Sequence, residues 1–249
     1  MKQKIKNALI SVSDKTQLVS ILKTLKKYKI KIISSGGTYS SIKKLGYDCT
    51  EISKYTGFKE MLDGRVKTLH PKIHAGILHD RFNKRHQGEM IKQKFPSIDL
   101  IIVNFYPFQK IVIESKNSKK IIDNIDIGGP TMVRSAAKNF NNVTIITNKN
   151  DYLDLIREME KNNGGTSLKF RELMSSKAFG LTAYYDAMIA NWFNKKLKIE
   201  FPERKTIFGR KLKKLRYGEN PHQQSSIYVS DYNDKQLGFN QLHGKELSF

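Results

Sequence analysis

The chain has 249 residues, 39% of them hydrophobic and 10% aromatic, which is enough to bury a core and too much for a disordered tail. Its single cysteine, Cys49, excludes a disulfide scaffold and a cysteine-ligated zinc site, and no apolar run reaches the roughly 20 residues that span a bilayer. The net charge of +22 comes from 36 lysines and 9 arginines against 23 acidic residues, and the lysines are spread along the whole chain.

This lysine-rich charge predicts solvated surfaces, because arginine is the residue expected where a protein reads phosphates and bases bidentately. Two alternatives are a nucleic-acid-binding surface and a positive field that steers a phosphorylated metabolite. No signal-peptide core follows Met1, so we expect a cytoplasmic protein that binds neither nucleic acid nor membrane.

The first 161 residues alternate between strand and helix patterns. Strands are predicted over residues 8–12, 31–34, 50–52, 99–105 and 143–147, and helices over residues 18–25, 39–45, 81–94, about 130–139 and 151–161. Ser13 or Asp14 is the expected N-cap of the first helix, with Asp14 and Gln17 at capping-box spacing. Residues 56–76 are predicted to be irregular. Strands separated by helices indicate a mainly parallel sheet that binds ligands outside the carboxyl ends of its strands.

The remainder of the chain has a different pattern. A long helix is predicted over residues 167–195 and a last strand over residues 226–229. We expect a first domain over residues 1–199 and, over residues 200–249, the N-terminal fragment of a truncated second α/β domain. Fifty residues are marginal for an independent core, and the chain stops without a helix cap or a polar tail.

A candidate phosphate cradle lies at Ser35-Gly36-Gly37-Thr38, between a strand and a helix. Glycines let the backbone approach an anion, and hydroxyls and the first N–H groups of a helix supply donors. A plain turn would use the same residues. The Walker and G-x-G-x-x-G patterns are absent from the sequence, so neither an ATPase nor a Rossmann dehydrogenase is supported.

Residues 64–76 are dense in polar side chains. Arg65 and Lys67 suit contact with a phosphate or a carbonyl oxygen. His70 and His74 have the i, i+4 spacing of a metal site, but the glutamate of H-E-x-x-H is missing and Pro71 disrupts a simple helix. We therefore expect both histidines to make structural hydrogen bonds and no metal to bind.

Two further segments offer chemistry. Tyr106, after the most apolar strand, is either an oxyanion hydrogen-bond donor or a core aromatic. Asp126 and Lys138 flank one predicted helix and would lie about 18 Å apart at 1.5 Å per residue. They can meet if Asp126 lies on a loop that folds back, or if the two residues come from different subunits. Cys49 has no nucleophile motif around it and is expected to be a small core residue.

Several motifs in order carry a resemblance to a known family. They are S-V-S-D-K-T at residues 11–16, S-G-G-T at 35–38, G-R-V-K-T-L-H-P at 64–71, H-A-G-I-L at 74–78, N-F-Y-P-F at 104–108, I-D-I-G-G at 125–129 and A-A-K-N at 136–139. The chain resembles the bifunctional purine biosynthesis family that combines phosphoribosylaminoimidazolecarboxamide formyltransferase with IMP cyclohydrolase. The resemblance implies an α/β, methylglyoxal synthase-like three-layer fold with a mainly parallel sheet, then a helical region and the truncated second domain.

The resemblance also implies a reaction and a set of site residues. The reaction is the dehydrative ring closure of 5-formamidoimidazole-4-carboxamide ribotide to IMP, without cofactor or metal. The implied catalytic residues are Lys67, Tyr106, Asp126 and Lys138. The implied substrate-binding residues are Ser11, Ser13, Lys15, Ser35, Gly37, Thr38, Arg65, Thr68, Asn104, Gly128 and Gly129. Lys67 and Tyr106 would stabilise the oxygen that leaves as water, and Asp126 and Lys138 would handle the carboxamide proton.

The motifs L-R-Y-G-E-N-P-H-Q at residues 215–223 and L-H-G-K-E-L-S at 242–248 resemble the opening of the transformylase domain. Arg216 and Tyr217 match its substrate-side positions. 10-Formyltetrahydrofolate would be needed only by a complete transformylase domain, so no folate binding is expected of this chain. The family implies a homodimer. The alternatives are a methylglyoxal synthase-like phosphate lyase and a non-catalytic, nucleotide-binding regulatory module.

Overall fold

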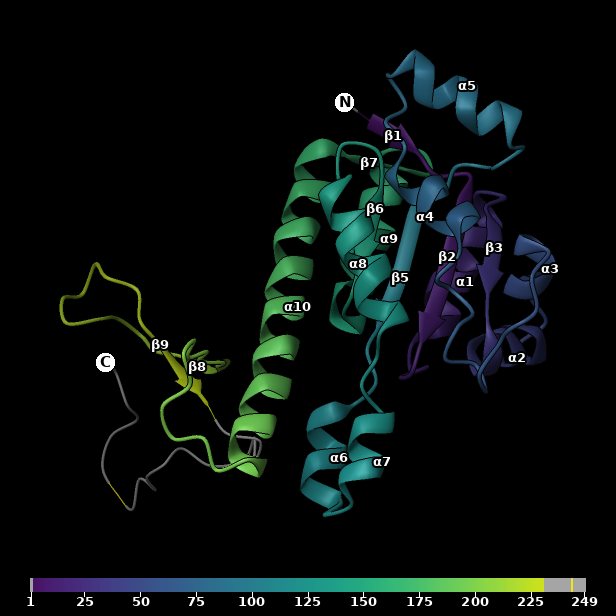
Figure 1. Cartoon of the computed structure of the whole chain (residues 1–249). Coiled ribbons are helices and arrows are strands. Elements are labelled where there is room, and N and C mark those ends of the chain that lie inside the picture. Colours follow the sequence, from purple (N-terminus) through teal and green to yellow (C-terminus); the bar gives the residue numbers. More distant parts are fainter. Residues whose placement is uncertain (1, 231–242, 244–249) are drawn as a thin grey trace. The chain divides into compact units, whose positions relative to one another are not determined.

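The computed structural model describes residues 2–230 and residue 243 (Figure 1). The chain divides into two compact units, one formed by Met1–Tyr106 and Ile125–Thr182 and the other by Pro107–Asn124 and Ala183–Phe249. The domain boundary that we expected between residues 199 and 200 falls inside the second unit and stays a prediction. Within the described residues, no helix combines the length and the apolar character needed to cross a membrane.

A five-stranded parallel sheet forms the centre of the first unit. Its strand order is β4-β3-β2-β5-β6. The strands are β2 (Asn7–Val12), β3 (Lys31–Ser34), β4 (Thr50–Glu51), β5 (Leu100–Asn104) and β6 (Thr144–Ile146). A separate antiparallel pair joins β1 (Lys2–Lys4) to β7 (Gly165–Ser167). The predicted α/β class and mainly parallel sheet are confirmed. Strands β2, β3, β5 and β6 bury aliphatic residues on both faces, as is typical of a parallel sheet covered by helices.

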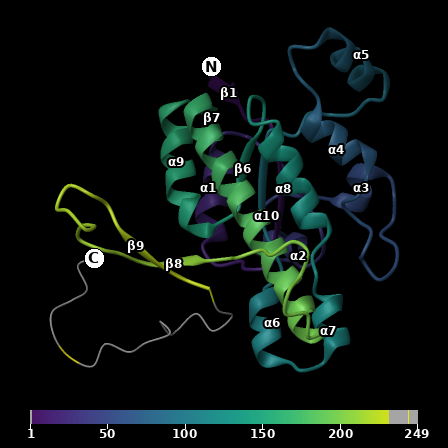
Figure 2. The ribbon, with the colours of Figure 1, turned by 60° about the vertical axis from the view of Figure 1, so that its left-hand side comes forward.

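Helices cover both faces of this sheet. The first unit contains α1 (Leu18–Lys27), α2 (Gly36–Lys44), α3 (Ile52–Thr56), α4 (Pro71–Leu78), α5 (Lys84–Lys92), α8 (Gly128–Lys138), η1 (Lys149–Asp151), α9 (Tyr152–Lys161) and the first part of α10 (Leu168–Lys196). Helix α1 packs with α9, and α4 packs with α8 (Figure 2). Right-handed crossovers place α1 and α8 on opposite faces, because the chain moves from β2 to β3 in one direction and from β5 to β6 in the other. The result is the three-layer arrangement.

Local departures from the predicted elements have physical causes. Helix α1 begins after Gln17, a left-handed N-cap at φ 62° that makes no side-chain capping bond. The expected cap, Asp14, instead accepts hydrogen bonds from the N–H and hydroxyl of Thr16. Helix α2 begins at Gly36, so the predicted turn is already its first turn. Pro71 does not disrupt a helix but begins α4, where a first-turn proline loses no hydrogen bond.

Two buried charged groups fix the first unit. Asp99 lies beside Arg81 at 2.8 Å and accepts from the N–H groups of Lys6 and Asn7, which fixes the start of β2 against β5. Arg171 on α10 is 1% exposed and donates to the carbonyl oxygens of Phe140, Asn141 and Thr166, which lie before β6 and on β7. No sequence pattern indicated these contacts of Asp99 and Arg171.

The second unit holds α6 (Phe108–Glu114), α7 (Ser118–Asp123), the last part of α10 and the antiparallel pair β8 (Arg210–Lys214) and β9 (Ser226–Val229). Phe108 packs edge-on against Tyr185 and Trp192 of α10, with ring centroids 6.0 and 6.3 Å away. The motif at residues 242–248 lies outside the described residues except for His243.

Candidate active site

The predicted site residues gather at the carboxyl edge of three adjacent strands. Strands β3, β2 and β5 end at Ser34, Val12 and Asn104, and a loop or helix with predicted site residues follows each of them. The chain reverses its direction across the sheet between β2 and β5. In open parallel sheets such a switch point is where a ligand-binding crevice forms.

The loop after β2 is held in place by Asn104. Its Oδ1 accepts from the N–H of Ser13 at 2.6 Å and from that of Asp14 at 3.1 Å, and its Nδ2 donates to the Asp14 carbonyl at 3.2 Å. The Ser13 hydroxyl also lies 2.8 Å from Asn104 Oδ1 and from the Phe105 carbonyl. In the structure Asn104 holds Ser13 and Asp14, and its role in substrate binding stays a prediction.

Two lysines approach the start of α2. The Nζ of Lys15 lies 3.7 Å from the position that a β-carbon on Gly37 would take, and the Nζ of Lys67 lies 3.6 Å from the corresponding position on Gly36. Gly36 has φ 51°, a left-handed conformation that favours glycine. Ser35, the N-cap, makes no side-chain capping bond. The first N–H groups of a helix, a serine hydroxyl and two ammonium groups therefore lie at the start of α2, a combination that suits an anion.

Thr38 has a different role from the one predicted. Its side chain is buried, and its hydroxyl accepts from the Val12 N–H at 3.0 Å and donates to the Val12 carbonyl at 2.9 Å. The hydroxyl thus extends the hydrogen bonding of β2 beyond the end of β3. A phosphate at α2 would meet the N–H groups of the first turn and not this hydroxyl.

Asp126 and its neighbours form the second part of the site. Asp126 Oδ1 accepts from the Gly129 N–H at 2.8 Å, and its carboxylate also accepts from the Tyr106 N–H. Burial raises the pKa of Asp126, and these N–H groups and the positive charge of Lys67 partly offset that rise. The structure therefore brings Lys67, Tyr106 and Asp126 together. The Tyr106 ring is 42% exposed, which excludes the core-aromatic alternative.

Close packing around the start of α8 needs its two glycines. A β-carbon on Gly128 would overlap the Thr68 hydroxyl, and one on Gly129 would overlap the Asp126 carboxylate. Thr68 is buried, so its hydroxyl faces the start of α8 and not bulk solvent. These glycines act by letting Thr68 and Asp126 come close.

Lys138 is not brought to this group within one chain. It is exposed in the last turn of α8, whereas Asp126 precedes the first turn. The 11 residues of α8, from Gly128 to Lys138, span about 15 Å at a rise of 1.5 Å per residue. Of the two arrangements that the sequence left open, Asp126 does fold back, but onto Gly129 and not toward Lys138.

The other predicted residues lie nearby or elsewhere. Ser11 is a half-buried residue of β2, and Arg65 is exposed on the tight loop closed by the Met61–Val66 bridge. Arg216 is exposed and Tyr217 half-buried between β8 and β9, in the second unit.

The histidines have the structural roles that we predicted. His70 caps α4, its Nδ1 accepting from the Lys72 N–H at 3.1 Å, and His74 Nδ1 lies 3.2 Å from the Ser135 hydroxyl. Burial lowers the pKa of His74. Among residues 2–230 and 243, no group of three or more His, Cys, Asp or Glu side chains is arranged to hold a metal ion.

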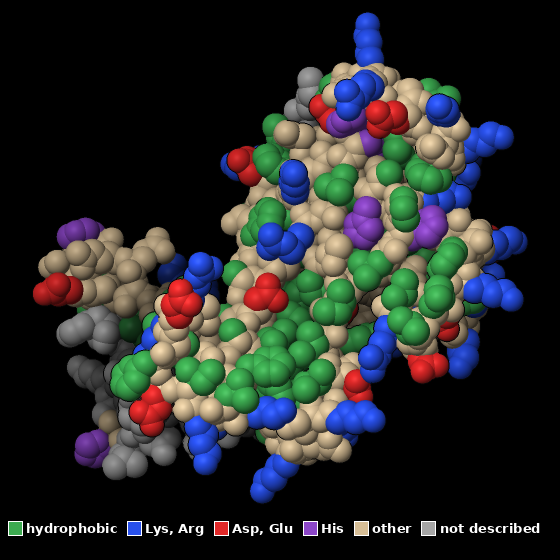
Figure 3. All heavy atoms as spheres, viewed as in Figure 1, with side chains coloured by type: hydrophobic (Ala, Val, Ile, Leu, Met, Phe, Trp, Pro, Cys, Tyr) green, Lys and Arg blue, Asp and Glu red, His purple; other side chains and the backbone are tan. Residues whose placement is uncertain are grey.

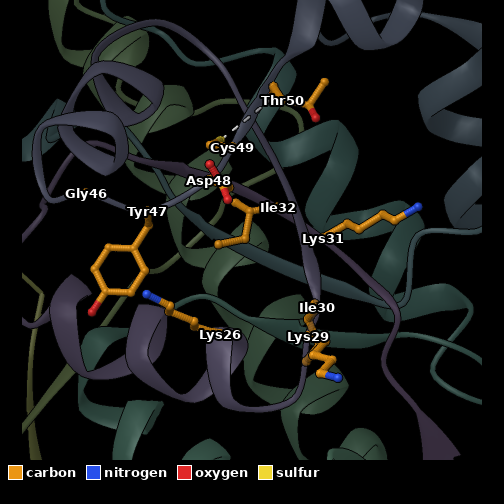
Figure 4. A pocket seen from close by; sticks show the side chains of 10 residues that line it. All are labelled: Lys26, Lys29, Ile30, Lys31, Ile32, Gly46, Tyr47, Asp48, Cys49 and Thr50. Atoms are coloured by element: carbon orange, nitrogen blue, oxygen red, sulfur yellow. Dashed lines mark hydrogen bonds between the residues drawn. The ribbon is translucent and has the colours of Figure 1, made fainter.

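A cavity of about 320 Å³ lies at the opposite edge of the sheet, beside the starts of β3 and β4 (Figure 4). Lys26 points toward Tyr47, with its Nζ 5.8 Å from the ring centroid, whereas Lys29 and Lys31 point away from that ring. Cys49 lines this cavity half-buried, so the core position that we predicted for it is wrong. The lysines that line this cavity point in different directions, whereas Lys15 and Lys67 both approach the start of α2.

The positive charge of the chain is dispersed on the face that Figure 3 shows. Lysine and arginine side chains lie both around the outline and within this face, and acidic, apolar and uncharged groups separate them. The described side chains in this view therefore form no continuous basic patch of the kind that binds a nucleic-acid backbone.

Sequence reasoning missed the partners that support the loop after β2. Lys149, on η1, donates to Asp14 Oδ2 at 2.8 Å and lies 2.9 Å from the Thr16 hydroxyl. The D-x-T spacing at residues 14–16 is a signal for the local turn. No local signal indicates Lys149, because it is 135 residues from Asp14 along the chain.

Comparisons with known proteins match both parts of the chain. Residues 17–131 match the family model of the MGS-like domain, which confirms the predicted methylglyoxal synthase-like fold, and residues 136–249 match that of the AICARFT/IMPCHase bienzyme. The chain is 44% identical over 250 residues to the bifunctional purine biosynthesis protein PurH of Bradyrhizobium diazoefficiens, and 47% identical over 247 residues to that of Oceanobacillus iheyensis. These matches cover 99% and 98% of this chain.

The same matches cover 47% and 48% of the two relatives, so the chain spans about half the length of the curated relatives it matches. Among solved structures, the chain is similar to one titled "Crystal structure of ForH", with a TM-score of 0.68 and 29% identity. That similarity covers 76% of this chain and 97% of the other.

Proposed function

Because the chain is a homologue of the bifunctional purine biosynthesis proteins over its whole length, we propose that it has IMP cyclohydrolase activity. The reaction is the ring closure of 5-formamidoimidazole-4-carboxamide ribotide to IMP with loss of water. The observation that carries this proposal is the convergence of Lys15, Lys67 and the start of α2 beside Tyr106 and Asp126. A ribotide would place its phosphate at Lys15, Lys67 and the start of α2, and its ring with polar substituents at Tyr106 and Asp126.

The 5′-phosphate would bind at the start of α2. The N–H groups of Gly36 and Gly37, the Ser35 hydroxyl and the Lys15 ammonium supply donors and positive charge there. Ser13 lies on the same loop as Lys15. This binding would fix the ribose and direct the substrate ring toward Tyr106 and Asp126.

The bond changes assign roles to the remaining groups. The carboxamide nitrogen attacks the formyl carbon and loses one proton, and the formamido nitrogen loses a second as the C=N double bond of the new ring forms. The formyl oxygen takes up two protons and leaves as water. Lys67 and the Tyr106 hydroxyl would stabilise that oxygen as negative charge develops on it. Asp126 would accept the carboxamide proton, and a pKa raised by burial makes its carboxylate a stronger base than an exposed one. Holding the two groups of one substrate in contact contributes further, because the reaction is intramolecular.

Lys138 would join this chemistry only from a second copy of the chain. Its exposure at the far end of α8 leaves it accessible to a partner. We propose a homodimer on this ground and on the resemblance. The proposal needs no cofactor, and it does not extend to formyl transfer from 10-formyltetrahydrofolate or to the roles of Arg216 and Tyr217 in such a transfer.

The test is turnover of the formylated ribotide by the purified 249-residue chain, with IMP separated chromatographically. We expect turnover, and a loss of about a hundredfold or more in Lys67→Ala. Lys54→Ala, which removes an exposed lysine on α3, is the matched control and should turn over at the wild-type rate. A folded wild-type chain without turnover, or an active Lys67→Ala variant, would contradict the proposal.

One other function has a specific observation in its favour. The MGS-like match over residues 17–131 includes the cradle at α2, which would also suit a lyase acting on a small phosphate ester. Release of phosphate from dihydroxyacetone phosphate would support that lyase. The placement of Tyr106 and Asp126 beside Lys67 favours the ribotide, which has a ring to contact them.

A further inference from the structure

Lys149 lies two strands away from the loop whose residues it contacts. It is the first residue of η1, directly after β6, and β5 separates β6 from β2 in the sheet. Its ammonium group nevertheless donates to Asp14 Oδ2 at 2.8 Å and to the Thr16 hydroxyl at 2.9 Å. We propose that Lys149 is a positioning residue of the phosphate cradle, where it holds Asp14 and neutralises its charge so that Ser13 and Lys15 face the anion.

The geometry of the loop supports this role. Asn104 holds the main chain of Ser13 and Asp14 from the β5 side, and Lys149 holds the side chains of Asp14 and Thr16 from the β6 side. Between these supports the Asp14 Oδ1 accepts from the Thr16 N–H at 2.9 Å, which closes a tight local turn. Lys15 is thus flanked by two residues whose side chains Lys149 fixes.

The charge of Asp14 gives the second reason. A carboxylate beside Ser13 and Lys15 would repel a phosphate and compete with it for the Lys15 ammonium group. The ammonium of Lys149 and the hydrogen bonds from Thr16 hold the pKa of Asp14 well below its ordinary value, so the carboxylate is ionised across the physiological range. The Asp14 carboxylate would therefore always repel a phosphate bound nearby unless a cation neutralised it, and the ammonium group of Lys149 is that cation.

The short helix η1, which carries Lys149, is itself held in place. Asn148 caps η1 by accepting from the Asn150 N–H at 2.9 Å, and the buried Asp151 pairs with Lys177 of α10. The side chains of Lys149 and Asp14 are 38% and 44% exposed. Because a pair so exposed contributes little to stability, its removal should affect ligand binding and leave the fold intact.

The experiment measures the affinity of the full 249-residue chain for IMP and, separately, for ribose 5-phosphate by calorimetry. Lys149→Met should weaken both by about tenfold, because the Asp14 charge beside Ser13 and Lys15 is then uncompensated. In turnover assays KM should rise by a similar factor, with kcat within about twofold of wild type. Lys149→Arg should restore affinity, and Asp14→Asn added to Lys149→Met should recover most of the loss.

The matched control is Lys27→Met, which removes the same charge from an exposed pair with Glu160 at 3.5 Å on another part of the surface. It should bind like wild type. Wild-type affinity in Lys149→Met, an equal loss in Lys27→Met, or a fall in kcat with KM unchanged would each overturn the inference.

This inference rests on the proposed function only in the choice of ligand. If the wild-type chain binds ribose 5-phosphate but neither binds IMP nor forms it, the proposed function fails while the comparison of Lys149→Met with wild type still decides the role of Lys149. If the wild-type chain binds neither phosphate ester, the cradle and the role of Lys149 fail together.

Discussion

Thr38 offers the sharpest test of how the fold builds the cradle. Its hydroxyl makes two hydrogen bonds to the main chain of Val12, which is 4% exposed, as is Thr38 itself. Thr38→Val keeps the size and shape of the side chain and removes both bonds. Each buried main-chain group left unpaired costs about 1–3 kcal/mol, so the expected loss of unfolding free energy for the two groups is about 2–6 kcal/mol. Thr38→Ser keeps both bonds and loses one methyl group, at a cost of about 1 kcal/mol.

The assay is urea unfolding followed by far-ultraviolet circular dichroism, combined with hydrogen exchange of peptides from β2 and α2. Circular dichroism is preferable to fluorescence, because the single tryptophan, Trp192, belongs to the second unit. Thr38→Val should unfold at lower urea and exchange faster in β2, and Thr38→Ser should retain phosphate-ester affinity. Equal destabilisation by Val and Ser would refute the argument, because packing of the methyl group and not the hydroxyl would then decide the stability.

Three other predictions use the same chain. Asp126→Asn should abolish turnover and leave the free energy of unfolding at pH 7 equal to or higher than that of wild type, because a carboxyl with a raised pKa destabilises the fold when it is ionised. In urea unfolding, the difference between variant and wild type should shrink as the pH falls through the pKa of Asp126. A variant less stable than wild type at pH 7 would contradict this reasoning. Arg171→Met should lower the free energy of unfolding in urea by about 3 kcal/mol, whereas Arg157→Met, which removes an exposed ion pair, should lower it by less than about 0.5 kcal/mol. Similar small losses in both variants would show that the buried hydrogen bonds of Arg171 do not stabilise the fold. Burial raises the pKa of Cys49 to about 12, so thiol alkylation at pH 8 should be at least about a hundredfold slower in the folded chain than in urea, and equal rates would refute the burial.

The regular part of the fold was predictable because local pattern and tertiary role agree. Strand β3 covers residues 31–34 and β9 covers residues 226–229, as predicted, since each contains a short apolar run that is read locally. Helix α4 was missed because a proline was interpreted as a helix breaker, whereas His70 caps the helix and Pro71 takes its first position. The short helices α6 and α7 carried no periodic stripe long enough to indicate them.

The candidate site residues could be named only where they lie in ordered motifs, and their catalytic and binding roles stay predictions. Lys67, Tyr106 and Asp126 were named from such motifs, and the structure places them together. Lys138 was named in the same way, but a helix of 11 residues separates it from Asp126 within one chain. The supporting contacts of Asn104, Thr38 and Lys149 join segments 26 to 135 residues apart, and no local pattern encodes such pairs.

We propose that the carboxyl edge of β2, β3 and β5 binds a nucleotide through its phosphate. A comparison of the affinities of the wild-type chain for IMP and for inosine tests this directly, because the two ligands differ only in that phosphate. We expect IMP to bind at least about a hundredfold more tightly, because Lys15, Lys67 and the start of α2 lose their partner in inosine. Equal affinities, or no binding of IMP by the folded chain, would contradict it.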